Sequence, residues 1–193
     1  MSDLPRKRAR TLFEIPEYRG WLSWISSVDH KQIGLMYLAC SLGFLLVGVV
    51  MALMMRTQLI HPENHWLGPG TYNEIFTMHG TTMIFLAVMP MLVGFSMYFV
   101  PLMIGARDMA FPRLNAFAYW MYLFGGLLLY FSFIGGGAPA AGWFSYAPLT
   151  ETAYNIDHGI DYWAFGLLIS GVGSVATGST SAYLVAGSYH MPQ

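Results

Sequence analysis

Charged side chains are scarce in this chain: they make up 10% of its 193 residues, whereas an ordinary soluble domain has about 25%. The net charge is only −1, so no basic surface for nucleic acid is expected. Cysteine is rarer still, because Cys40 stands alone, and this excludes a disulfide framework and any paired-cysteine metal or redox site. A single cysteine inside an apolar run is most simply a small packing residue.

What the chain does contain is apolar sequence, at 55% of all residues, in runs long enough to cross a bilayer. This composition predicts an all-α membrane protein with four transmembrane helices in one bundle. The expected helices cover about 33–55, 74–104, 114–134 and 162–187, within a transmembrane region at 33–187. Before it we expect a cytoplasmic or interfacial segment at 1–32, and after it a polar tail at 188–193.

Basic residues are distributed unequally between the two sides of these predicted spans. Six precede the first span and two lie in the loop at 105–113, whereas Arg56 is alone on the opposite side. Loops rich in Lys and Arg remain in the cytoplasm. The sequence therefore predicts that both termini are cytoplasmic.

The second predicted span carries a histidine, His79, at a depth where an ionisable side chain needs a reason. The preceding Thr71-Tyr72-Asn73-Glu74 fits a capping box, which predicts that the helix starts near Tyr72. His79 is either a packing residue hydrogen-bonded to a neighbouring helix or an axial ligand of haem iron. The neighbouring Gly80 leaves room for a flat macrocycle, while Phe76, Met83 and Phe85 offer an apolar wall. Pro90, further along, predicts a tilt or kink.

Other polar residues allow two readings each. Arg56 is either a snorkelling arginine at the membrane surface or a charge that tunes a haem. Asp108 is either a solvated loop acid paired with the arginines on either side or a proton-entry carboxylate, with Asn115 ordering water one turn further in. The pair His61 and His65 has a spacing of four, but in a loop with one acid it is weak support for a metal site.

Several stretches together resemble subunit I of the haem-copper terminal oxidases, the cytochrome c oxidase family. The order and spacing of these stretches are specific to that family, and the resemblance covers residues 29 to about 178. The stretches are DHKQIGLMYL at 29–38, YNEIFTMHGTTMIF at 72–85, MP at 89–90, VPLMIGARDMAFPRLN at 100–115 and GWFSYAPL at 142–149, with Arg56 between the first two.

The resemblance implies roles for individual residues. His79 would ligate the iron of the low-spin haem, of haem a type, and Arg56 would contact the formyl group of that haem. Tyr72 would lie near the same haem, and Trp143 and Tyr146 near its propionates. In the proton pathway named D, the resemblance implies Asp108 as the entrance, Asn115 just above it and Ser174 further along.

Some positions depart from the family pattern. Ala116 and Met97 replace two pathway asparagines, Gly173 replaces a serine beside Ser174, and Gln58 stands where many relatives have a glutamate at a cation site, so we predict no ion there. After Gly178 the sequence also diverges. The ligands of copper and of the high-spin haem, and the second ligand of the low-spin haem, are absent from this chain, which is expected to be inactive alone.

The resemblance implies the N-terminal part of a proton-pumping oxidase subunit in a bacterial inner (plasma) membrane. The complete enzyme would pass electrons from cytochrome c, or alternatively quinol, to oxygen, with subunits II and III as partners. A different possibility is a truncated or split membrane chain with no activity of its own, acting as a structural or assembly partner. Haem retention by the isolated chain distinguishes the two.

Overall fold

The computed structural model describes residues 20–188, and in this part of the chain every regular element is a helix. Four stretches are long and apolar enough to cross a membrane, which confirms the predicted all-α fold with four spans. The elements are α1 (Leu22–Ile25), α2 (His30–Gln58), α3 (Pro69–Thr81), the π-helical η1 (Thr82–Val88), α4 (Met89–Met103), α5 (Pro112–Phe131) and α6 (Gly159–Ser188).

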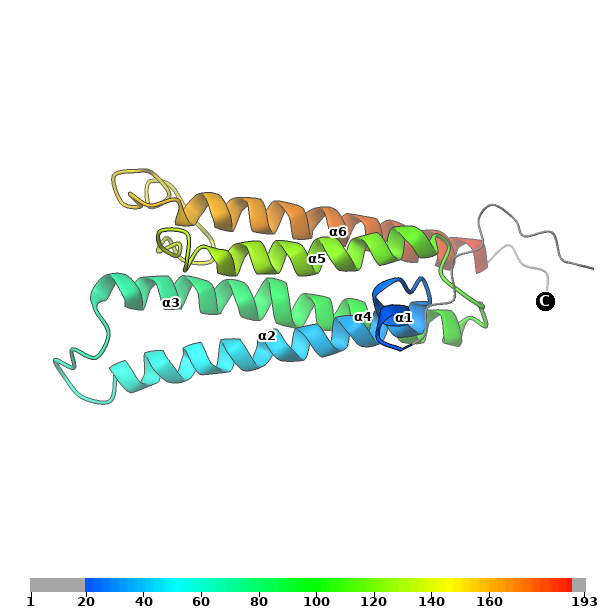
Figure 1. The fold of residues 1–193 in the computed structure, drawn as a ribbon, viewed down its shortest axis with the longest axis horizontal. Helices are drawn as coiled ribbons and strands as arrows, with labels where there is room; N and C mark the ends of the chain where they lie inside the picture. The colour runs from blue at the N-terminus through cyan, green and yellow to red at the C-terminus, as the bar shows by residue number, and fades with distance from the viewer. Residues whose placement is uncertain (1–19, 189–193) are drawn as a thin grey trace, which may run out of the picture.

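The four spans form two antiparallel pairs laid side by side (Figure 1). One pair is α2 with the continuous span of α3, η1 and α4, and the other is α5 with α6. We call the end of the bundle that carries α1 and the 104–111 connection the His30 end. The opposite end, with the loops at 59–68 and 132–158, is the Arg56 end.

The predicted terminal segments fall mainly outside the described residues. Of the segment at 1–32, residues 20–32 are described, and there Trp21, just before α1, and Trp24 and Ile25 within it are exposed. Of the predicted tail at 188–193, Ser188 alone is described, as the last residue of α6.

Local chemistry sets where the helices begin and end. The Asp29 carboxylate caps α2 by accepting the backbone N–H of Lys31 at 2.9 Å, so this helix begins at His30. The capping-box prediction was wrong: α3 begins at Pro69, with no side-chain cap. Proline fits the first turn because its φ is preset and its missing N–H would be unpaired there anyway. The third span, predicted to end at residue 134, ends earlier, because α5 stops at Phe131.

The long second span contains a wide π-helical turn, η1, directly before Pro90. A proline ring cannot donate to the carbonyl four residues earlier and crowds it, which here is the carbonyl of Leu86. That carbonyl instead accepts the hydroxyl hydrogen of Tyr122 on α5, at 2.8 Å. The expected distortion at Pro90 is therefore a π turn whose freed backbone group is satisfied by a neighbouring helix.

Glycines allow α5 and α6 to pack very closely. A Cβ at Gly125 would lie 2.6 Å from the Gly166 carbonyl oxygen, and one at Gly173 would lie 2.6 Å from the Ala118 carbonyl oxygen. Such contacts between small residues are typical of membrane helix pairs. At the second contact, the Cβ of a serine at position 173 would collide with the backbone of α5.

The core lies between the two pairs, and the outer surfaces are apolar. Ile33, Tyr37, Leu86, Met97, Tyr119 and Tyr122 form its main buried cluster. Large apolar residues such as Leu46, Leu92 and Leu168 are about two-thirds exposed and face outward. This inverted pattern is what a bundle surrounded by lipid requires.

Candidate functional site

His79 is positioned by α2. Its ring Nδ1 lies 2.9 Å from the backbone carbonyl oxygen of Gly48. A carbonyl oxygen can only accept, so Nδ1 carries the hydrogen and, in the neutral imidazole, Nε2 keeps its lone pair. Histidines that bind metal are almost always held in this way by a hydrogen bond at their other nitrogen. This geometry fits an axial ligand that binds iron through Nε2. It fits equally well a packing residue that makes an interhelical hydrogen bond.

The close approach of α2 makes this bond possible. A Cβ at Gly48 would lie 2.6 Å from the sulfur of Met83, so a larger residue here would require the flexible Met83 side chain to move. A Cβ at Gly34 would lie 3.1 Å from the Gly94 carbonyl oxygen, another close approach to the second span, whereas nothing lies within 4 Å of one at Gly43.

Arg56 and Tyr72 lie on the same two helices as this bond. Each is roughly two turns, or about 11 Å, further toward the Arg56 end than the Gly48–His79 pair. Arg56 is exposed in the last turn of α2, and within residues 20–188 no carboxylate forms an ion pair with it. Tyr72 is half-buried. Arg56 and Tyr72 therefore lie at a similar height in the bundle, between His79 and the Arg56 end.

The loop between α5 and α6 reaches the helix that carries His79. Trp143 lies against Gly80, where an added Cβ would be 3.0 Å from the indole Cδ1, and its ring centre is 6.4 Å from that of Phe85. The space we expected beside Gly80 for a macrocycle is therefore taken by an indole. Tyr146 is 70% exposed and contacts the ring of Phe144.

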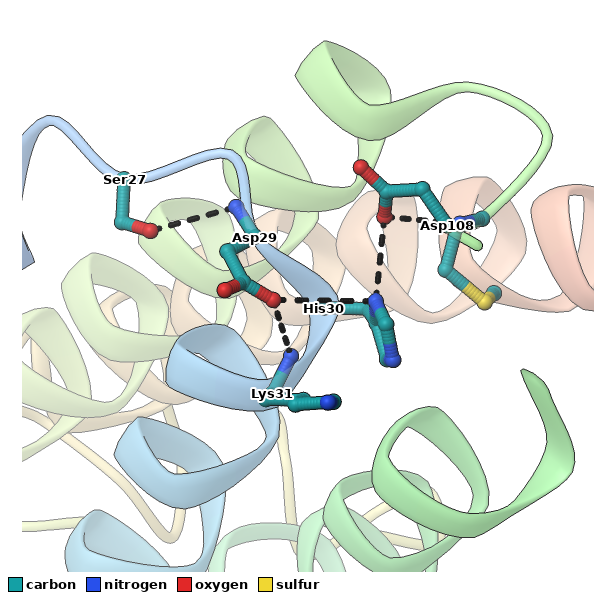
Figure 2. A network of polar contacts seen from close by, with 6 residues as sticks. Ser27, Asp29, His30, Lys31 and Asp108 are labelled. Atoms are coloured by element: carbon teal, nitrogen blue, oxygen red, sulfur yellow. Dashed lines mark hydrogen bonds and ion pairs between the residues drawn. The ribbon is translucent and has the colours of Figure 1, made fainter. Parts of the chain in front are cut away.

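At the opposite end, Asp108 forms a network with the start of α2 (Figure 2). Its Oδ1 accepts the Met109 backbone N–H at 2.7 Å and lies 3.2 Å from Nδ1 of His30. The His30 ring is only 3% exposed and also lies 3.6 Å from the Asp29 carboxylate. His30 is therefore a buried residue that lies between two acids.

The arginines beside Asp108 in the sequence do not pair with it in the structure. Arg107 and Arg113 are exposed, and among the described residues the ion-pair partner of Asp108 is His30. The loop-acid reading based on those arginines was therefore wrong about the partner. With its side chain 39% exposed, Asp108 connects solvent to a buried imidazole.

Asn115 and Ser174 lie further into the bundle from Asp108. Asn115 is fully buried one turn inside α5, and neither atom of its side-chain amide has a protein partner within the described part of the chain. Ser174 donates to the Ser170 carbonyl at 3.3 Å and lines a cavity of about 640 Å³ between α4 and α6. Hydroxyl groups are frequent in its wall, from Tyr37, Ser96, Tyr122, Ser170, Ser174, Thr177 and Ser181.

The residues replacing the expected asparagines do not provide polar groups. Met97 is fully buried in the main core cluster, and Ala116 packs against the same cluster. The polar wall of the cavity comes instead from hydroxyls on α6 and from two tyrosines.

No metal cluster is formed by the side chains of residues 20–188. His61 and His65 are both exposed, so the loop at 59–68 gains no support as a metal site. Gln58 organises this loop directly: its amide nitrogen donates to the Asn64 carbonyl, and its oxygen accepts the Leu67 N–H at 2.7 Å.

The fold and the site define a class: a multi-pass helical membrane protein with a half-buried histidine hydrogen-bonded through Nδ1 to a backbone carbonyl and a carboxylate–imidazole pair at the opposite end. Residues 32–186 match the family described as "Cytochrome C and Quinol oxidase polypeptide I". The chain belongs to this family, the haem-copper oxidase subunit I proteins.

Individual relatives agree with this assignment. The chain is 49% identical to Cytochrome c oxidase subunit 1 of Bacillus subtilis over 162 residues, which are 83% of this chain and 26% of that protein. It is 52% identical to the protein of the same name in Bacillus sp. PS3, over 79% of this chain and 24% of that protein. It is also 47% identical to Quinol oxidase subunit 1 of Bacillus subtilis, over 82% of this chain and 24% of that protein. The chain thus spans about a quarter of the length of the curated relatives it matches.

Proposed function

We propose that this chain forms the haem-binding and proton-entry part of the catalytic subunit of a proton-pumping cytochrome c oxidase. The observation that carries the proposal is the Nδ1 hydrogen bond of His79 to Gly48, which leaves Nε2 free for iron. In the complete enzyme, aerobic respiration would deliver electrons from cytochrome c through the low-spin haem to oxygen. The ligands of copper and of the high-spin haem would come from outside this chain.

Around the haem, each residue of this chain has a defined task. His79 holds the iron, and the bond to Gly48 fixes its ring and raises its basicity as a ligand. Arg56, with no ion-pair partner in residues 20–188, supplies a positive charge at the haem edge. Tyr72, Trp143 and Tyr146 surround the Arg56 end of the site. A bound haem of a type supplies one-electron transfer, and the protein supplies ligation and charge.

Proton entry is assigned to the His30 end. Asp108 takes protons from water because its carboxylate is partly exposed, and His30 behind it is a second proton-binding group. Asn115 offers an unpaired buried amide that can hold water, and Ser174 and its neighbouring hydroxyls line the cavity beyond. We infer that this end faces the cytoplasm of a bacterium, with both termini inside, because the excess of Lys and Arg lies on this side of the spans.

Oxygen uptake by the assembled complex tests this function. Full-length subunit I containing this sequence, purified from membranes with its expected partner subunits II and III, should consume oxygen with reduced cytochrome c. Uptake with a quinol alone would assign the donor to the other branch, since relatives of both kinds match the chain. No uptake with either donor, together with no haem in the complex, would support the rival role of a structural or assembly partner.

A further inference from the structure

Two threonines on α3, the helix that carries His79, make hydrogen bonds to other parts of the chain. Thr77 is completely buried, and its hydroxyl donates to the Asn73 carbonyl at 2.8 Å. The same oxygen accepts the backbone N–H of Gly142 at 2.8 Å, across 65 residues of sequence. One turn further on, Thr81 donates to the Thr77 carbonyl and accepts the indole N–H of Trp163 on α6, at 3.0 Å.

The Thr77 contact fixes the loop at the residue before Trp143. Gly142 has φ +77°, a conformation that suits glycine, and its carbonyl accepts the N–H of Ser145 in a tight turn. Because its N–H is anchored to Thr77, the turn holds the indole of Trp143 against Gly80. Gly80 is the neighbour of His79 in the chain. Thr77 lies on a different face of the helix from His79. It therefore influences the surroundings of His79 only through the loop that carries Gly142 and Trp143.

We propose that Thr77 is a positioning residue: its hydroxyl seats Trp143 beside His79 and thereby sets the redox potential of the haem that His79 binds. The effect on the potential rests on the proposed haem function, whereas the seating of the loop does not. The indole covers Gly80 on this side of the helix. Removing the anchor would admit water, which stabilises the more highly charged oxidised iron and lowers the potential.

The test compares three variants of full-length subunit I in the assembled complex. Thr77→Val keeps the shape of the side chain but leaves the Gly142 N–H without a partner. Thr77→Ser keeps the hydroxyl. Thr81→Val, the matched control, removes an equivalent buried hydrogen bond one turn away without touching the loop. The two readouts are the midpoint potential of the haem and the hydrogen–deuterium exchange of the peptide that contains Gly142.

Thr77→Val should lower the potential and speed exchange at Gly142, while Thr77→Ser and Thr81→Val should match the wild type in both. Equal shifts of the midpoint potential in Thr77→Val and Thr81→Val would mean that Thr77 is only a packing residue. An unchanged potential in Thr77→Val with haem bound would overturn the proposal. Faster exchange in a complex with no haem at His79 would refute the proposed function but not the seating of the loop. If Thr77→Val fails to assemble, Gly80→Ala presses on the indole from the other side, and an unchanged potential there would overturn the proposal.

Discussion

Replacing His79 by alanine is expected to abolish the absorption of the low-spin haem in the full-length, assembled subunit. Alanine removes the imidazole that we propose as the iron ligand, and it leaves the Gly48 carbonyl without its donor. The loss should be complete rather than partial, because an axial ligand cannot be replaced by the apolar residues around it. The reduced-minus-oxidised spectrum of the purified complex measures this directly.

His158→Ala is the matched control. This histidine is 81% exposed, pairs with Asp161 at 3.1 Å and lies at the same end of the bundle as Arg56. Its removal should leave the haem spectrum unchanged. A normal spectrum in His79→Ala would refute the ligand assignment and favour the packing interpretation of this residue.

Replacing Asp108 by asparagine is expected to slow turnover and proton pumping by about 100-fold, the lower end of what a positioned proton-transfer group contributes, while both haems stay bound. The amide oxygen of asparagine can still accept the Met109 N–H, so the local fold should survive. What disappears is the group that binds a proton and pairs with His30. The size of the effect follows from the contribution of a positioned proton-transfer group, which is at least about 10²-fold in favourable cases.

Asp161→Asn provides the comparison for this prediction. Asp161 also pairs with a histidine, at 3.1 Å, but it is exposed and lies at the opposite end of the bundle. The Asp161→Asn substitution should leave turnover and proton pumping unaffected. Proton uptake by Asp108→Asn at the wild-type rate, measured with a pH indicator during single turnovers, would remove Asp108 from the entry pathway.

The fold could be predicted from sequence because lipid imposes simple requirements. Runs of apolar residues long enough to span a bilayer can only be helices, so the four spans were identifiable from composition alone. The ends of the helices were harder to predict from the sequence. The capping pattern at Thr71 competed with a proline at the first helical position, and the structure shows that the proline begins the helix.

Individual site residues were identifiable from the sequence, but their partners were not. His79 stood out as an ionisable residue in an apolar run, yet its partner is a backbone carbonyl, which has no sequence signature. His30 and Asp108 are separated by 78 positions, and only the packing of α2 beside the 104–111 connection brings them together. The anchor at Thr77 was missed for the same reason, since a buried threonine in a membrane helix usually bonds only to its own backbone.

The most direct measurement is a cryo-electron microscopy map of the full-length subunit in its assembled complex. Our account predicts a haem with its iron on Nε2 of His79, Nδ1 of the same ring directed at the Gly48 carbonyl, and Trp143 seated on Gly80. A map in which Nε2 of His79 contacts only protein or lipid, with the haem held by other residues, would contradict it.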